Sequence, residues 1–266
     1  AKTYGLPTGQ KYEKLKFQLV NNLIIIPLEV NGTELSFILD SGVSKPILFN
    51  LTDQEAVPLN NVSEIAIRGL GGGEPIKALS SSGNSFKLKN IKNEDQLLYV
   101  VLDKDLNFSP ALGVTVHGII GYDLFRAFIV DVNYASKTIK FHDPETYKYK
   151  KNRKSETLPL SIIKRKAYVD GQLFLEEENE VPVKLLVDTG SSDAMWLFKD
   201  EAIDIPDKNY ADFLGEGLNG SIFGKRTKVK SINLGPFELK DAKAAFPDMA
   251  SYNGIKNLGD RNGSLG

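Results

Sequence analysis

The chain has 266 residues, which is enough for two domains of roughly 130 residues that each bury a core. Its 33 Lys and Arg residues balance 34 Asp and Glu, and a net charge of −1 gives no overall field that would recruit nucleic acid. The chain has no cysteine, which excludes thiol catalysis. It has only two histidines, which makes a Ser-His-Asp triad or a His-rich metal site a poor match to its composition. No apolar run reaches the roughly 18 residues of a membrane-spanning helix.

The first half of the chain reads as mostly β-strand after a polar arm, 1–14, which we expect to be loose. Asn21-Asn22 and Asn31-Gly32 predict tight hairpin turns, because both residue types tolerate positive φ. The best helical candidate is Tyr122–Phe128. The strands predicted from apolar runs are Leu15–Val20, Leu23–Val30, Leu35–Leu39, Ile65–Ile67, Phe86–Leu88, Leu97–Leu102, Ile129–Asn133 and Thr138–His142.

A basic run, Tyr147–Lys154, separates the two halves. We interpret it as a solvated linker, 148–155, between an N-terminal lobe at 15–147 and a C-terminal lobe at 156–266. The alternative is a phosphate-binding patch, but no second basic or stacking platform lies nearby in the sequence.

The second half repeats the order of predicted elements found in the first half. We expect strands at Ala167–Val169, Gln172–Leu175 and Val181–Val187. Between the last two lies the acidic stretch Glu176–Glu180. It could ligate calcium, but it lacks the alternating oxygen ligands and central glycine of a calcium loop. We therefore favour an exposed hairpin tip.

One motif occurs once in each half, as Phe37–Gly42 and as Leu185–Gly190. Each copy is an apolar run that ends on one Asp followed by Ser or Thr and then Gly, and each is followed by further apolar sequence. Burying a lone carboxylate is costly. Two such runs therefore predict that Asp40 and Asp188 meet.

Two carboxyl groups that share a site hold one proton between them, so one acts as base and the other as acid. A water between Asp40 and Asp188 would be deprotonated by the base and attack an amide carbonyl, while the acid protonates the carbonyl oxygen. This chemistry needs no histidine, cysteine, metal or cofactor, and a chain poor in the first two can perform it.

The residues beside the two aspartates have roles in this picture. Gly42 and Gly190 let backbone N–H groups approach the carboxylates, while the hydroxyls of Ser41 and Thr189 could bond across to the other half. Taken singly, these would be ordinary turn residues. Two matched copies favour the functional interpretation.

Two further elements are repeated. Gly69–Gly73 follows the first motif, and the stretch Gly215–Gly224 follows the second. Near the end of each half lie Gly118–Gly121 and Gly263–Gly266.

These motifs resemble those of aspartic peptidases of the pepsin and retropepsin type, in particular the bacterial retropepsin-like proteins with two motifs in one chain. The resemblance covers almost everything from Leu15 onward. It implies that Ile119-Ile120-Gly121 and, less closely, Ser264-Leu265-Gly266 pack beside the two Asp loops. The chain departs from the pattern at Val43, where pepsin-like enzymes place a small hydroxyl residue; Ser191 keeps that hydroxyl in the second copy.

The resemblance also implies flap-like loops that cover bound substrate. We assign this role to the two Gly-rich stretches, whose glycines would permit opening and closing, although neither carries the flap Tyr of pepsin-like enzymes. The residues assigned to substrate binding are Gly69, Leu70, Gly71, Gly72, Gly73, Gly217 and Gly220.

The expected fold is mostly β, with two β-barrel lobes related by a pseudo-twofold axis and a cleft between them. The expected function is cleavage of peptides or unfolded proteins as an endopeptidase. Two alternatives remain open: a catalytically silent peptide-binding relative, although such relatives commonly lose one aspartate, and a carbohydrate-binding β protein, for which Trp196 alone supplies little aromatic platform.

The internal repeat predicts one irregularity. The first half continues past Gly121 with a helix and two strands, whereas no copy of that segment follows Gly266. We expect a truncated second lobe, whose uncovered sheet edges would favour self-association.

Overall fold

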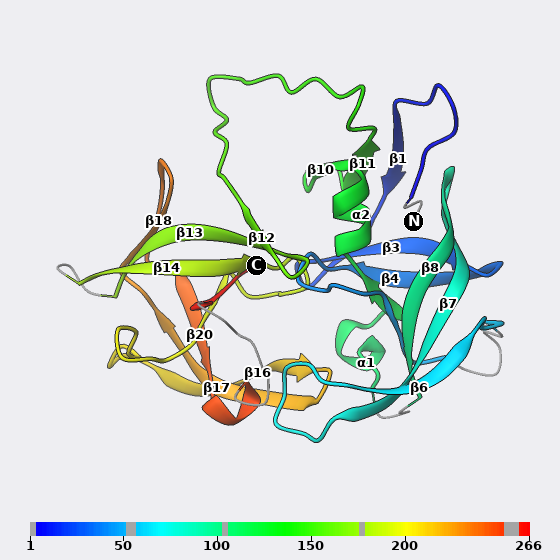
Figure 1. Ribbon diagram of the computed structural model, residues 1–266. Coiled ribbons are helices and arrows are strands. Elements are labelled where there is room, and N and C mark those ends of the chain that lie inside the picture. The colour runs from blue at the N-terminus through cyan, green and yellow to red at the C-terminus, as the bar shows by residue number, and fades with distance from the viewer. Residues whose placement is uncertain (1–3, 52–56, 103–105, 176–178, 253–260) are drawn as a thin grey trace. The chain divides into compact units, whose positions relative to one another are not determined.

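The computed structural model describes residues 4–51, 57–102, 106–175, 179–252 and 261–266, and strands dominate it (Figure 1). By their contacts the residues form two compact units, 1–67 with 76–150 and 68–75 with 151–266. The mostly-β prediction with two lobes is confirmed. None of the helices in the described ranges is long and apolar enough to cross a membrane.

The first unit contains an eight-stranded sheet and a three-stranded sheet. In the larger sheet the strand order is β2-β3-β4-β9-β5-β8-β7-β6, and an additional pairing joins β3 to β7. The smaller sheet has the order β1-β11-β10. The elements are β1 (Tyr12–Lys16), β2 (Gln18–Val20), β3 (Leu23–Val30), β4 (Thr33–Leu39), β5 (Ile47–Leu48), β6 (Val62–Ile67), β7 (Ile76–Leu88), β8 (Ile91–Val101), α1 (Ser109–Leu112), β9 (Gly118–Ile120), α2 (Tyr122–Ala127), β10 (Ile129–Asn133) and β11 (Thr138–His142).

Both predicted hairpin turns of the first unit are present. Asn21 and Asn22 have φ of 47° and 66° between β2 and β3, and Asn31 and Gly32 have φ of 49° and 88° between β3 and β4. These left-handed conformations match the twist of antiparallel strands. They fix the register in which β3 and β4 alternate side chains into the core.

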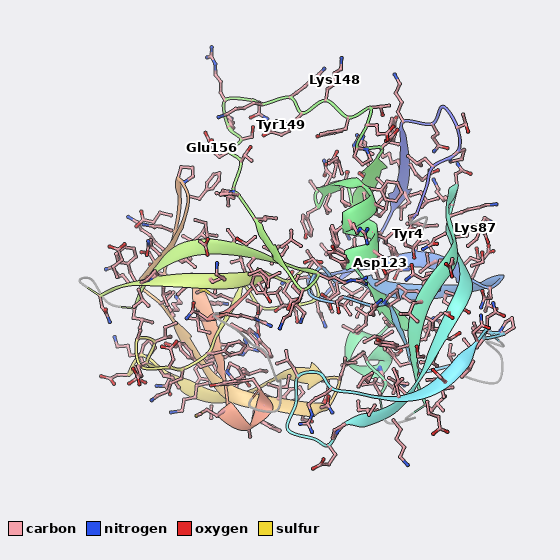
Figure 2. The ribbon with its side chains drawn as sticks, in the orientation of Figure 1. Tyr4, Lys87, Asp123, Lys148, Tyr149 and Glu156 are labelled. Carbon is pink, nitrogen blue, oxygen red and sulfur yellow. The ribbon has the colours of Figure 1, made fainter. Side chains whose placement is uncertain are left out.

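The N-terminal arm is more ordered than the sequence suggested. Strand β1 begins at Tyr12 and pairs with β11, and the side chain of Tyr4 is buried. Burial and, next, the negative charge of Asp123 raise the pKa of the Tyr4 hydroxyl well above its ordinary value (Figure 2). The prediction of a loose arm is therefore wrong at Tyr4 and Gly5 and from Tyr12 onward, because burial of Tyr4 and strand pairing hold these residues.

The second unit is built around one sheet with the strand order β16-β17-β20-β15-β21-β14-β13-β18-β19, and β12 pairs with β13 beside this path. Its acidic stretch, 176–180, lies mostly outside the described residues. The elements are β12 (Ser161–Ile163), β13 (Lys166–Phe174), β14 (Glu180–Val187), β15 (Met195–Leu197), β16 (Tyr210–Gly217), β17 (Gly220–Lys228), β18 (Ser231–Leu234), β19 (Phe237–Lys240), β20 (Lys243–Pro247), a 3-10 helix (Met249–Ser251) and β21 (Gly263–Leu265).

Each unit inserts a late strand between two earlier ones. In the first, β9 runs parallel to β4 and antiparallel to β5. In the second, β21 runs parallel to β14 and antiparallel to β15. Since β4 and β14 each end directly before an Asp, this shared topology places beside each motif a strand that a glycine directly follows.

Each unit has its own apolar core. Ile24, Phe37 and Leu39 lie in the core of the first unit, and Leu185, Leu197 and Phe246 lie in that of the second. The basic run between the units is exposed, as Lys148 and Tyr149 illustrate (Figure 2). The boundary between 150 and 151 falls inside the predicted linker.

Candidate active site

The Asp40 loop is built from backbone hydrogen bonds at the end of β4. The Asp40 N–H donates to the carbonyl oxygen of Ile120 at 2.8 Å, which joins the loop to β9. The Gly42 N–H donates to Oδ1 of Asp40 at 2.6 Å, and the Val43 N–H donates to the Asp40 carbonyl oxygen at 3.2 Å. The Asp40 carboxylate is thus oriented by its own turn.

The Asp188 loop repeats this construction at the end of β14. The Asp188 N–H donates to the carbonyl oxygen of Leu265 at 2.8 Å, which joins the loop to β21. The Gly190 N–H donates to Oδ1 of Asp188 at 3.1 Å, and the Ser191 N–H donates to the Asp188 carbonyl oxygen at 3.1 Å. These three backbone bonds of the first loop therefore each have a counterpart in the second.

Gly121 shows why a glycine directly follows the inserted strand. A Cβ at Gly121 would clash with the carbonyl oxygen of Asp40, so the only residue type that fits is one without a side chain. At Gly266 a Cβ would clash with the carbonyl oxygen of Asp193, in the stretch that follows Asp188. The close approach predicted for these two glycines is therefore present within each unit.

Beyond the shared frame, the Asp188 loop is braced by side chains. The Asp193 carboxylate accepts hydrogen bonds from the Trp196 indole N–H at 2.7 Å and from the Arg226 guanidinium. Arg226 also donates from Nε to Asp212 at 2.6 Å, so it ties the loop to both strands of the β16–β17 hairpin. Burial opposes the charge of Arg226, but its bonds with Asp193 and Asp212 outweigh burial and raise its pKa.

This brace was not predicted from the sequence, although the internal repeat contains a signal for it. Asp193 stands five residues after Asp188, and the corresponding place after Asp40 is Lys45. A charge of opposite sign at matched places indicates that the two loops are held by different partners.

The two Gly-rich stretches both occur in the second unit. Residues 68–75, which we call the strap, join β6 to β7 in the chain but pack with the second unit. The second stretch forms the end of the β16–β17 hairpin, where Gly217 pairs with Gly220 across the turn. That these residues cover a bound substrate remains a prediction.

The structure places both aspartates at half-buried positions, each in its own unit. Their approach to one another is a prediction from the sequence, as are the hydrogen bonds expected from the hydroxyls of Ser41 and Thr189 across to the other half. Within each unit, the N–H group of the motif glycine donates to the Asp carboxylate, as expected.

Each unit therefore contributes one Asp loop that lies beside an inserted strand. A family model described as aspartyl protease matches the chain twice, over residues 26–124 and 172–266. Because the two regions together cover well over half of the chain, it belongs to this family of retropepsin-like aspartyl proteases. A search of curated proteins gave no match.

Proposed function

We propose that the protein is an endopeptidase that hydrolyses peptide bonds in extended peptides or unfolded proteins, with Asp40 and Asp188 as a catalytic pair. The observation that carries the proposal is the matching set of backbone hydrogen bonds in the two Asp loops. In both, one N–H donates to the neighbouring inserted strand, and the glycine N–H donates to the carboxylate. The two units differ in the side chains around these loops. An Asp with no role in catalysis would not need the same backbone hydrogen bonds in both.

In this mechanism the two carboxyl groups share one proton. The ionised carboxylate takes a proton from water, whose oxygen attacks the carbonyl carbon of the peptide bond, and the protonated carboxyl gives its proton to the carbonyl oxygen. In the second step the proton taken from water passes to the leaving nitrogen, the C–N bond breaks, and one diol proton restores the shared proton. The N–H groups of Gly42 and Gly190 hold the carboxylates in place throughout.

The test is digestion of an unfolded protein and of a peptide library between pH 3 and 8, with and without a statine-containing inhibitor. We expect cleavage that is fastest at acidic pH and is blocked by the inhibitor. We also expect it to be lost in Asp40→Asn and in Asp188→Asn. Asp170→Asn is the matched control, since Asp170 is exposed, forms an ion pair with Lys184 and lies outside both Asp loops. Cleavage retained in either motif variant would contradict a shared proton, and peptide binding without cleavage would favour a silent binding module.

A further inference from the structure

Asn219 lies in the turn of the β16–β17 hairpin, and the polar groups of its backbone and side chain form hydrogen bonds with the strap. Its side-chain Oδ1 accepts a hydrogen bond from the Gly69 N–H, and its Nδ2 donates to the Glu74 carbonyl oxygen at 2.6 Å. Its backbone N–H donates to the Leu70 carbonyl oxygen at 2.9 Å, and its carbonyl oxygen accepts from the Gly73 N–H at 2.9 Å. Asn219 is buried, so each of these groups would lose its partner if the strap moved away.

The glycines of the strap are required by this contact. A Cβ at Gly71 would lie 2.5 Å from the backbone of Asn219, and one at Gly73 would lie 2.6 Å from the Asn219 carbonyl oxygen. A Cβ at Gly69 would lie 2.7 Å from the Leu218 side chain. Gly72 differs, because its nearest atom would be 3.7 Å away, at ordinary contact distance. Three of the four glycines therefore let the strap close around Asn219, which gives them a role besides flexibility.

The strap also covers apolar surface of the second unit. Leu70 packs against a cluster of buried side chains formed by Trp196, Leu214, Ile222 and Ala245. The Gly71 N–H adds a hydrogen bond to the Ser251 carbonyl oxygen at 2.9 Å. The hairpin thus holds the strap by backbone bonds in both directions and by one inserted apolar side chain, which is how a β-hairpin would hold an extended peptide.

We propose that Asn219 is a latch that keeps the strap closed over this apolar surface, and that an extended peptide places an apolar side chain there when the latch is open. The peptide-binding half of this inference rests on the proposed function, whereas the latch itself does not. Because the four bonds of Asn219 share one residue, they break together, and the strap has two states, closed and open. A peptide competes with Leu70 for the same surface and binds when the strap is open.

Hydrogen exchange of the full chain tests the latch without any enzymatic activity. Asn219→Asp keeps the shape and the acceptor for Gly69 but replaces the donor to Glu74 with an oxygen that repels the carbonyl. We expect the amides of Gly71 and Gly73 to exchange about tenfold faster or more, because a buried carbonyl loses its partner. Asn209→Asp is the matched control, since the Asn209 Nδ2 donates to the carbonyl oxygens of Pro206 and Asp207, three and two residues away in the chain.

A pair of glycine variants tests the backbone side of the latch. Gly73→Ala should open the strap through the clash with the Asn219 carbonyl oxygen, whereas Gly72→Ala should leave the exchange of Gly71 and Gly73 unchanged. The chain has one tryptophan, and Trp196 lies in the cluster beneath Leu70, so its fluorescence reports the same event. We expect a red-shifted emission and stronger acrylamide quenching in Asn219→Asp and Gly73→Ala, and in neither control.

Exchange and fluorescence that stay at wild-type values in both Asn219→Asp and Gly73→Ala would overturn the latch. Stopped-flow binding of a statine-containing pentapeptide, followed by Trp196 fluorescence, tests the other half. We expect association about tenfold faster in Asn219→Asp, because more of the protein is in the competent state. Equal association rates, or no binding to either form, would overturn the gating of peptide binding. Absent cleavage with faster exchange would count against the proposed function alone.

Discussion

The Asp40 loop and the Asp188 loop share a frame and differ in what supports it. In the first unit the Val43 carbonyl oxygen accepts a hydrogen bond from the N–H of Tyr122 at 3.1 Å, so the loop rests on the start of α2. In the second unit the support is a set of side chains, in which Asp193 links Trp196 and Arg226. The backbone bonds that orient the carboxylates are the part common to both.

This difference separates two kinds of requirement. Whatever the two loops share must satisfy the demands of the Asp motif itself, because the surroundings of the two copies are otherwise unlike. The helix start at Tyr122 and the charge network at Arg226 serve one loop each. Substitutions in the frame should therefore act alike in both units, and substitutions in the supports should act on one.

The largest effect should come from the carboxylates. Asp40→Asn and Asp188→Asn should each lower peptide cleavage by about a thousandfold or more, because each removes one partner of proton transfer. Both should keep the far-ultraviolet circular dichroism of the wild type, since the Gly42 and Gly190 N–H groups can still bond the amide oxygen. A large difference in residual activity between the two variants would show that the two loops are not equivalent in catalysis.

The next effect should come from the glycines that begin the inserted strands. A Cβ at Gly118 would lie 2.6 Å from the Ile47 carbonyl oxygen, and one at Gly263 would clash with the Trp196 carbonyl oxygen. We expect Gly118→Ala and Gly263→Ala each to lower the free energy of unfolding by about 2–3 kcal/mol through overpacking. Urea denaturation measures this.

Gly5→Ala is the control for that pair, because in the part of the chain that the structure describes a Cβ there would meet nothing within 4 Å beyond its chain neighbours. If one of the two strand variants were as stable as this control, the two insertions would not be equivalent in packing.

Arg226 should matter to the second loop alone. Arg226→Met leaves Asp193 and Asp212 without their cation, and we expect a loss of about 1–2 kcal/mol in unfolding free energy, since the ion pairs are only partly buried. The near-ultraviolet signal of Trp196 should change with it, because Asp193 also accepts the indole N–H. Lys228→Met, on the exposed part of the same strand, should change neither; an unchanged tryptophan signal in Arg226→Met would show that the brace is not needed.

The smallest effect concerns pH and the first unit. Burial alone would raise the pKa of Glu13, but hydrogen bonds from Gln10, the Lys14 N–H, Asn90 and Lys89 outweigh it and lower the pKa from 4.5. Since the folded pKa is lowered, this stabilisation is present above the unfolded value and is lost as pH falls through the folded one. Glu13→Gln should therefore cost about 1 kcal/mol at pH 7 and nothing at pH 2.

Thermal denaturation between pH 2 and 7 measures that difference, with the exposed Glu34→Gln as control. A gap between Glu13→Gln and the wild type that stays constant over this range would contradict the link to the titration of Glu13.

Much of the strand structure follows from apolar runs. Leu23–Val30 is a strand with the predicted bounds, and Tyr122–Ala127 is the predicted helix without its last residue. The long strand β7 was predicted only at its end, Phe86–Leu88, because its middle is polar. There, Ser81 and Asn84 are buried and hydrogen-bond to each other, so burial depends on a partner that a hydrophobic pattern does not reveal.

The candidate site was predictable where the motif is local and was not where it depends on distant partners. Asp40 and its Gly42 donor lie two residues apart, so the turn can be read from the sequence. The strap differs, because its partner Asn219 is 150 residues away from Gly69. The glycines of the strap were interpreted as sources of mobility, yet at Gly71 and Gly73 their small size permits close approach.

The insertion of β9 and β21 has a consequence for the order in which the molecule forms during synthesis. The Asp188 N–H donates a hydrogen bond to the carbonyl oxygen of Leu265, but Asp188 leaves the ribosome long before Leu265 does. In the same way, Asp40 precedes its partner Ile120. Neither Asp loop has its full set of backbone bonds until the late strand has entered between two strands already made. We expect a nascent chain to carry each carboxylate in an unformed loop until the late strand of the same unit has been made, so that acquisition of the site is coupled to completion of each unit.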